Sequence, residues 1–355
     1  MTAISNIKSE VRELKAYTLK RQDCQIKLNQ NESPADMPSD LKELILERVQ
    51  QKPWNRYPDF HPQDVLERLG ADHGLCSRSV LIGNGSNELL QAIFQACVGP
   101  GQTVSIPCPT FTLYKTMIAA NGGSTDLVHL DSDLQYDAAL YLSRAALKDR
   151  HLVICNPNNP TGSWLSPEVI SQLCESTPRL VIVDEAYIEF AETPGCASLI
   201  AKHSNLIVLR TYSKAMGLAG VRFGYALGSP ELMDEVGKIK LPYNVGHFGL
   251  EVIRAALDSK QYTAALADQI IKERQRVFRE LDGMGVEAVP SKANFILFRH
   301  QTSAILWQNL VQRGILIRDV SHYPRLSGCL RVTIGSRADN DAFLNAMRDI
   351  LKELS

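Results

Sequence analysis

The stretch NLIVLRTYSKAMGLAG, residues 205–220, places a lysine just beyond an apolar run of strand-forming residues. Burying a cationic side chain at the end of such a strand costs free energy unless another group uses its charge or its amine. Lys214 stands among hydroxyl groups, with Thr211 and Ser213 before it and Arg222 eight residues after it. Desolvation keeps part of a lysine amine neutral, which is typical of a lysine that acts as a nucleophile.

Short β-branched runs recur on both sides of this stretch. They predict strands in the segments SVLIGNG, TVSIP, DLVHL, HLVICN, LVIVDEAY, NLIVLRT and RFGYALG. Helix-like segments, such as 86–97 and 166–176, separate many of them. Runs that are apolar on both faces and linked by helices form sheets covered on both sides. We therefore predict an α/β fold with a mostly parallel sheet.

A chain of 355 residues is longer than the chains that usually fold around one hydrophobic core, so two domains are expected. We predict a large domain over 51–270 and a small C-terminal α+β domain over 271–355. Residues 1–50 are predicted to form an arm and a helix that contribute to the small domain, with the helix of 41–51 packed near it. The long helical pattern over 244–281 is expected to connect the two domains.

The composition is that of an ordinary globular protein, with 45% hydrophobic and 22% charged residues and a formal net charge of −1. Such a charge favours neither nucleic acid nor an anionic membrane as a partner. The N-terminal segment lacks the apolar core of a signal peptide, and no apolar run is long enough to span a bilayer, so a cytoplasmic protein is expected. The eight cysteines and eight histidines are scattered, which predicts reduced thiols and no metal site.

A glycine-containing turn, GNGSNE, follows the first of the predicted strands. Gly85 permits a tight turn, Ser86 can cap the following helix, and the first free backbone N–H groups, near Asn87, can face an anion. An ordinary helix cap is an equal alternative for this turn taken alone. The spacing of the glycines matches neither a dinucleotide fingerprint nor a phosphate-binding P-loop.

Two further polar segments follow predicted strands. The loop CNPNNPTG, 155–162, is stiffened by its prolines and directs amide side chains to one place, although a structural turn is the simpler alternative. Asp184 ends an apolar strand, where an unpaired carboxylate is costly; a protonated ring nitrogen would pair with it, and capping of a neighbouring helix is the alternative. Ligands of open α/β sheets bind beyond the carboxyl ends of the strands. The hydroxyl groups of Thr211 and Ser213, together with Arg222, would hold a phosphate group. With Lys214 as the nucleophile, these segments indicate pyridoxal phosphate (PLP) as the cofactor.

The motifs NPNNPTG, VDEAY, RTYSKAMGLAGVRFGY, RYPD and LRVTIG stand in the order and spacing of fold-type I PLP-dependent aminotransferases. The chain resembles this family from about residue 26 to the C-terminus. The segments LNQNESP, PTF, PYNV, SKANFILF and GILIRD resemble the subgroup that acts on histidinol phosphate. The resemblance implies a large domain with a mostly parallel seven-stranded sheet between helices, a smaller α+β domain, and a homodimer with shared active sites.

The same resemblance implies a role for each matching residue. Lys214, Asp184 and Tyr187 are the implied catalytic residues: Lys214 binds the cofactor and moves a proton, Asp184 pairs with the ring nitrogen, and Tyr187 bonds the phenolic oxygen of the ring. The other implied cofactor-binding residues are Gly85, Ser86, Asn87, Phe111, Asn159, Thr211, Ser213, Arg222 and, from the other subunit, Tyr57. The implied substrate-binding residues are Asn31, Arg331 for the α-carboxylate, and Arg318 with Tyr17 for a phosphate.

The implied reaction is transamination of histidinol phosphate with 2-oxoglutarate, which yields 3-(imidazol-4-yl)-2-oxopropyl phosphate and glutamate in histidine biosynthesis. An aromatic amino-acid aminotransferase, a threonine-phosphate decarboxylase and a non-catalytic regulatory module of the same fold are the alternatives. Three positions depart from the common pattern of the family. Asn87 replaces a frequent Asp, Phe111 a frequent Tyr, and Met216 a small or aromatic residue, which bears on fine specificity.

Overall fold

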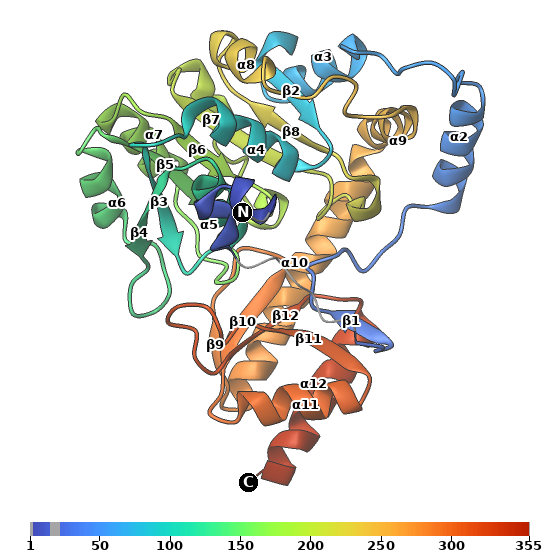
Figure 1. Cartoon of the computed structure of the whole chain (residues 1–355). Coiled ribbons are helices and arrows are strands. Elements are labelled where there is room, and N and C mark those ends of the chain that lie inside the picture. The colour runs from blue at the N-terminus through green and yellow to red at the C-terminus, as the bar shows by residue number, and fades with distance from the viewer. Residues whose placement is uncertain (1–2, 15–21, 355) are drawn as a thin grey trace.

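The computed structural model describes residues 3–14 and 22–354 of the chain. A larger part, built around a seven-stranded sheet, and a smaller part, built around a five-stranded sheet, lie at opposite ends of the molecule (Figure 1). The long helix α10 (Lys260–Gly283) runs from one to the other and passes through the boundary predicted near residue 270. No helix within the described residues is both long enough and apolar enough to cross a membrane.

The seven-stranded sheet has the order β2-β8-β7-β6-β5-β3-β4. Strand β8 runs antiparallel to both of its neighbours, β2 and β7, and the other neighbouring strands pair in parallel, so the prediction of a mostly parallel α/β sheet is confirmed. Each of the seven predicted runs contributes one strand. The strands are β2 (Val80–Gly83), β3 (Thr103–Cys108), β4 (Ser124–His129), β5 (Arg150–Cys155), β6 (Val181–Asp184), β7 (Leu206–Thr211) and β8 (Gly224–Leu227).

Apolar cores lie on both faces of this sheet. Side chains alternate between the faces along a strand, so Val181 and Val183 of β6 belong to one core and Ile182 to the other. All three are fully buried, which explains why the strand reads as a continuous apolar run. The helices of this part are α3 (Gln63–Ala71), α4 (Ser86–Cys97), α5 (Leu113–Ala120), α6 (Ala138–Ala145), α7 (Pro167–Ser176), α8 (Pro230–Gly237) and α9 (His247–Asp258), and the short α1 (Ser9–Arg12) contacts α5.

Local signals place the first residues of three of these helices. Ser166, Ser229 and Asp137 each accept a hydrogen bond from a backbone N–H in the first turn of α7, α8 and α6. A proline follows each of the two serines, where its fixed φ suits the first helical position. The sequence itself therefore determines where these helices begin.

The five-stranded sheet has the order β1-β11-β12-β10-β9, with β1 parallel to β11. Its other neighbouring strands run antiparallel. The helices α10 and α11 contact this sheet, α12 packs against both helices, and side chains of all three share a separate apolar core with the strands. Its elements are β1 (Ile26–Leu28), β9 (Glu287–Val289), β10 (Phe295–Arg299), α11 (Ser303–Gln312), β11 (Ile315–Asp319), β12 (Cys329–Thr333) and α12 (Arg337–Leu354).

The N-terminal region divides between the two parts of the molecule. Its strand β1 joins the small sheet, but helix α2 (Ser39–Gln50) packs against α9 of the large part (Figure 1). Ile45 and Val49, one turn apart, are buried in the same core as Leu250 of α9. The prediction that this helix packs near the small domain is therefore wrong, because its apolar stripe finds its partner on α9.

Candidate active site

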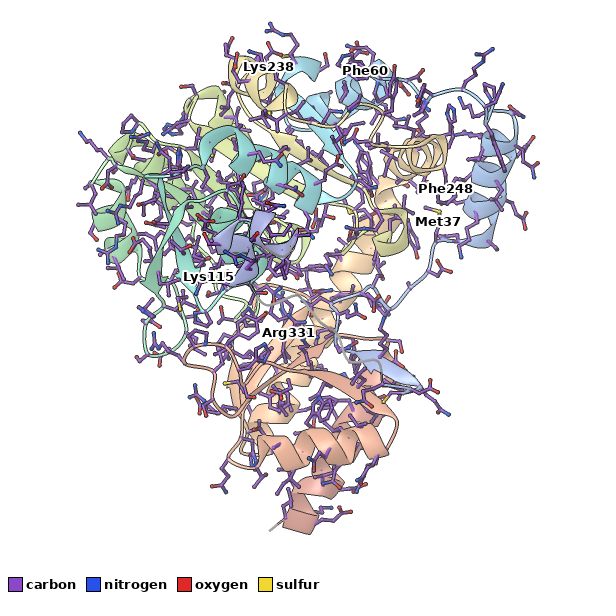
Figure 2. The ribbon with its side chains drawn as sticks, viewed as in Figure 1. Met37, Phe60, Lys115, Lys238, Phe248 and Arg331 are labelled. Carbon is purple, nitrogen blue, oxygen red and sulfur yellow. The ribbon has the colours of Figure 1, made fainter. Side chains whose placement is uncertain are left out.

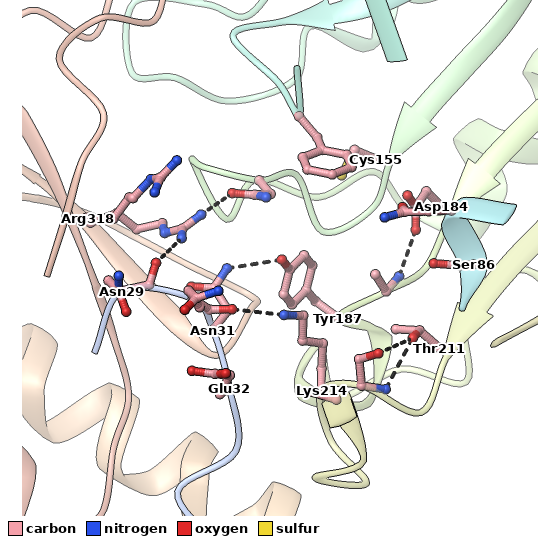
Figure 3. A pocket seen from close by; sticks show the side chains of 18 of the residues that line it. Asn29, Asn31, Glu32, Ser86, Cys155, Asp184, Tyr187, Thr211, Lys214 and Arg318 are labelled. Carbon is pink, nitrogen blue, oxygen red and sulfur yellow. Dashed lines mark hydrogen bonds between the residues drawn. The ribbon is translucent and has the colours of Figure 1, made fainter. Parts of the chain in front are cut away.

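A pocket of about 430 Å³ lies at the carboxyl ends of β6 and β7, where the large part faces β11 and β12 of the small part (Figure 3). This is the edge at which open α/β sheets bind ligands. The structure brings most of the predicted site residues together here. Those that line the pocket are Asn31, Ser86, Asn87, Phe111, Asn159, Asp184, Tyr187, Thr211, Ser213, Lys214, Arg222, Arg318 and Arg331.

Two predicted residues of the described chain do not line it. Gly85 lies just outside, at the position before the first residue of α4. Tyr57 is 78% exposed and stacks on Tyr243, with 4.5 Å between the ring centroids. Tyr17 lies outside the described residues.

The Lys214 amine projects into the pocket and donates a hydrogen bond of 2.9 Å to the backbone oxygen of Gln30. Burial and, to a lesser degree, the positive charge of Arg331 lower the pKa of Lys214 to about 8. An amine with such a pKa is in part uncharged near neutral pH. The lysine beyond the end of β7 is therefore suited to act as a nucleophile or to exchange a proton.

Asp184 ends β6 and is only 6% exposed. Its Oδ2 accepts a hydrogen bond of 2.6 Å from the hydroxyl of Tyr114, and its Oδ1 accepts one of 3.2 Å from the backbone N–H of Ala186. Burial raises the pKa of Asp184, whereas the bond from Tyr114 lowers it. Two donors thus hold a carboxylate that a cationic group in the pocket would stabilise further.

Tyr114 is a site residue that the sequence analysis missed. It lies in α5, is fully buried, and lines the same pocket as Asp184. Its ring meets that of Phe111 edge to face, with 5.6 Å between the centroids. Its position near the start of the helix that follows β3, three residues after Phe111, is the signal that could have identified it, because ligands bind beyond the carboxyl ends of such strands.

The start of α4 forms one wall of the pocket. Gly85 has φ +83°, and a Cβ there would collide with the guanidinium of Arg222. A Cβ at Gly224 would collide with the backbone nitrogen of Ser86. Glycine at both positions allows the strand β8 and Arg222 to approach the helix start closely. The first backbone N–H groups of α4 thereby face the pocket, where they can bind an anion.

Hydroxyl groups and Arg222 complete this anion-binding wall. Nη1 of Arg222 donates a hydrogen bond of 3.2 Å to Oγ of Ser213, and Oγ1 of Thr211 donates one of 3.0 Å to the same oxygen. All three residues line the pocket beside Ser86. Such a set of donors at a helix start suits a phosphate group.

Arginines of the small sheet form the opposite wall, and Arg331 lies where the two parts meet (Figure 2). Arg331 is buried; its Nη2 donates 3.0 Å to the backbone oxygen of Asn29, and its Nη1 donates to Oδ1 of Asn159. Its guanidinium also lies over the ring of Phe295, 5.1 Å from the centroid. Arg318 of β11 is paired directly opposite Arg331 of β12.

Asn31 connects the two walls. Its Nδ2 donates a hydrogen bond of 3.0 Å to the hydroxyl of Tyr187, and its Oδ1 accepts one of 3.1 Å from Thr333 of β12. Glu32 and Tyr323, which the sequence analysis did not single out, also line the pocket. No group of three histidine, cysteine or acidic side chains within residues 3–14 and 22–354 is placed to hold a metal ion.

Comparison with known proteins gives consistent matches. Residues 23–347 match the model of the family "Aminotransferase class I and II". The chain is 41% identical over 347 residues to the histidinol-phosphate aminotransferase of Chlorobium phaeobacteroides, covering 97% of this chain and 96% of that one. It is 39% identical over 329 residues to that of Chlorobaculum parvum, covering 92% and 93%.

Solved structures agree with these matches. The histidinol-phosphate aminotransferase of Sinorhizobium meliloti, in complex with pyridoxal-5'-phosphate, superposes over 100% of both chains with a TM-score of 0.87 and 25% identity. The L-threonine-O-3-phosphate decarboxylase of Porphyromonas gingivalis covers 92% of this chain and 99% of its own, with a TM-score of 0.78 and 22% identity. At that identity the second match shows a shared fold alone.

Proposed function

Since this chain belongs to the class I and II aminotransferase family, we propose that it transfers an amino group between histidinol phosphate and 2-oxoglutarate, in histidine biosynthesis. The products are 3-(imidazol-4-yl)-2-oxopropyl phosphate and glutamate. The relatives of nearly full length at 37–41% identity support this reaction. Neither the aromatic aminotransferase nor the decarboxylase alternative is favoured by them.

The observation that carries the substrate assignment is the pairing of Arg318 with Arg331. Side chains directly opposite each other in an antiparallel pair project from the same face, and like charges in that arrangement repel. Both arginines line the pocket that holds Lys214. A doubly charged phosphate between the two arginines would offset this repulsion better than a singly charged carboxylate would. Guanidinium groups also form bidentate hydrogen bonds with phosphate.

The residues of the pocket fit PLP. When bound, this cofactor supplies an aldehyde carbon that bonds amino groups and a protonated ring that withdraws electrons. The buried Asp184 carboxylate would hold the ring nitrogen, while Asn159 and Tyr187 would hold the phenolic oxygen. Phe111 would cover the face of the ring. The phosphate would lie at the anion-binding wall formed by Gly85, Ser86, Asn87, Thr211, Ser213 and Arg222.

The residues of the chain then divide the work of the reaction. The Lys214 amine, with its pKa near 8, would bond the cofactor and later accept, at Nζ, the proton from the substrate carbon that carries the amino group. Arg331 would orient the α-carboxylate of glutamate, and Arg318 the phosphate of histidinol phosphate. Asn31 would keep the hydroxyl of Tyr187 directed at the site through the bond described above.

We further propose a homodimer in which Tyr57 reaches the cofactor phosphate of the neighbouring subunit. Tyr57 stacks on Tyr243, and Phe60 meets Tyr243 edge to face at 5.4 Å. Trp54, three residues before Tyr57 in the chain, is 75% exposed. Exposed aromatic side chains in such proximity are typical of protein interfaces. The cytoplasmic setting is likewise a proposal, supported by eight cysteines that all carry free thiols.

A substrate panel tests the proposed reaction. Purified protein with PLP and 2-oxoglutarate should form glutamate faster from histidinol phosphate than from phenylalanine, and threonine phosphate should release no carbon dioxide. Glutamate formation from phenylalanine alone would favour the aromatic aminotransferase. Carbon dioxide release from threonine phosphate would favour the decarboxylase, and a lack of reaction with all three would contradict the proposal.

A further inference from the structure

The wall of the active-site pocket that carries Arg318 and Arg331 has a third polar side chain, that of Tyr323. Tyr323 lies on the loop 320–328, which joins β11 to β12. It is half-buried, and its hydroxyl is neither a buried atom nor hydrogen-bonded to another of the described residues. A neutral hydrogen-bond donor on this wall is therefore available to a ligand.

Phosphate and carboxylate groups differ in the number of oxygens that such a wall must satisfy. A phosphate ester has three terminal oxygens that accept hydrogen bonds, whereas a carboxylate has two. The guanidinium of Arg318 can bind two oxygens side by side. The third phosphate oxygen needs another donor once water is displaced. In the loop 320–328, Val320 and Tyr323 line the pocket, and of these two side chains only that of Tyr323 can donate.

The position of Tyr323 depends on how the loop 320–328 is held. The two arginines lie on paired strands of the small sheet, but the loop lies beyond the ends of those strands. Its residues Val320 and Leu326 are buried in the same apolar core as Leu130 of the large part. The loop therefore extends from the small sheet and packs on the large part.

Arg325 attaches this loop to the large part by hydrogen bonds. Its Nη1 donates to the backbone oxygen of Leu130, and its Nη2 donates 2.8 Å to that of Asp131. Leu130 is itself bonded, through its backbone N–H, to the oxygen of Cys108 at the end of β3, at 3.1 Å. Arg325 has φ +66°, a conformation that a residue with a Cβ keeps only where its surroundings hold it.

Backbone hydrogen bonds connect this attachment to Tyr323. The N–H of Leu326, directly after Arg325, donates 3.1 Å to the backbone oxygen of Tyr323. The N–H of Tyr323 donates 3.0 Å to the oxygen of Val320. Arg325 and Tyr323 thus belong to one short bonded turn, so loss of the Arg325 side chain would release that turn from the loop after β4.

We propose that Tyr323 is a specificity-determining residue whose hydroxyl donates a hydrogen bond to the phosphate of the substrate, and that Arg325 is the positioning residue that holds Tyr323 at the pocket. This inference rests on the proposed function. Arg318 binds two phosphate oxygens, and Tyr323 binds the third, which a carboxylate lacks. The wall therefore favours histidinol phosphate over glutamate.

Single-turnover kinetics of the PLP-loaded protein test the role of Tyr323. Tyr323→Phe keeps the ring and removes the hydroxyl, so the apparent Kd of histidinol phosphate should rise about tenfold or more, the effect of losing a hydrogen bond to a charged group. The limiting rate constant, which depends on Lys214 and Asp184, should change little, and so should the Kd of glutamate. Tyr262→Phe, which removes a hydroxyl bonded to a backbone oxygen outside this pocket, is the matched control.

A double-mutant cycle tests whether Arg325 acts through Tyr323. Arg325→Ala should raise the Kd of histidinol phosphate, but should add little to the effect of Tyr323→Phe, because the same contact is lost only once. Arg325→Lys keeps a charged donor and should restore part of the affinity. Arg279→Ala removes an exposed arginine that bonds only to its own helix, and so controls for the loss of charge. Amide hydrogen exchange should be faster at Tyr323 and Leu326 in Arg325→Ala.

The outcomes that contradict the proposal can be told apart. A normal reaction with a Kd unaffected by Tyr323→Phe would overturn the role of Tyr323 alone. Equal rises in the Kd of histidinol phosphate and of glutamate would show a general change in the pocket instead of phosphate recognition. Fully additive effects of the two substitutions, or unchanged hydrogen exchange in Arg325→Ala, would overturn the role of Arg325. If the unmodified protein does not react with histidinol phosphate, the proposed function fails, and this role fails with it.

Discussion

The hydroxyl of Tyr114 donates a hydrogen bond of 2.6 Å to Oδ2 of Asp184, and both groups are buried at the base of the active-site pocket. The two residues are 70 positions apart in the chain, on α5 and at the end of β6. The bond lowers the pKa of a carboxyl group that burial raises, and so favours its charged form. Tyr114 therefore helps to keep Asp184 able to pair with a cationic ring nitrogen.

Tyr114→Phe removes this hydrogen bond without a large change of volume. Asp184 then loses its stronger donor and is less easily ionised, so we expect the dissociation constant of PLP to rise and kcat to fall. A charge-assisted bond corresponds to about 10- to 150-fold in such a constant. Equilibrium titration with PLP and steady-state kinetics measure the two effects. Tyr136→Phe, which removes a buried bond of 2.6 Å to a backbone oxygen, is the matched control.

Asp184→Asn replaces the carboxylate by a neutral amide of the same shape. The variant should still bind PLP, because the anion-binding wall is intact, but kcat should fall by at least the order of 10², as for other lost electrostatic contacts in active sites. Asp126→Asn serves as the comparison variant, because the carboxylate of Asp126 pairs with Arg150 and does not line the pocket. A rate close to that of the unmodified protein would mean that another residue holds the ring nitrogen.

Arg318→Ala tests the paired arginines. Losing a charge-assisted contact to phosphate should lower kcat/KM for histidinol phosphate about 10- to 150-fold. The half-reaction with glutamate, which has no phosphate, should be affected less, and single-turnover rates with each substrate make the comparison. Arg313→Ala, which removes an arginine paired with Glu353 on the surface, controls for the loss of charge. Equal effects on both half-reactions would contradict a phosphate-binding role.

The lowered pKa of Lys214 predicts how cofactor capture depends on pH. Only the neutral amine attacks an aldehyde, so the rate at which the cofactor-free protein captures PLP should rise with pH through a midpoint near pH 8. Stopped-flow absorbance gives this profile. Arg331→Gln should move the midpoint upward, because the charge of Arg331 contributes to the lowered pKa. A midpoint near the ordinary lysine value of 10.5 would show that burial does not act on this amine.

Local patterns in the sequence predicted much of the fold. The seven apolar runs became seven strands, because β-branched side chains buried on both faces of a sheet leave a continuous signal over a few residues. The loop around Asn159 and the turn after β7 were also identified, since prolines, glycines and hydroxyl residues act on the backbone nearby. Lys214 and Asp184 stood out because an ionisable group at the end of a buried strand costs free energy unless another group pairs with it.

Tertiary structure decided the contacts that link distant segments. Nothing in the local sequence pairs Tyr114 with Asp184 or sets Arg318 opposite Arg331, because both relationships depend on how whole elements pack and on the register of β11 against β12. The packing of α2 followed the same rule: the sequence pattern predicted the small domain as its partner, whereas the folded chain packs it against α9. Sequence therefore identified most of the polar residues that line the candidate site, and long-range packing determined which of them meet.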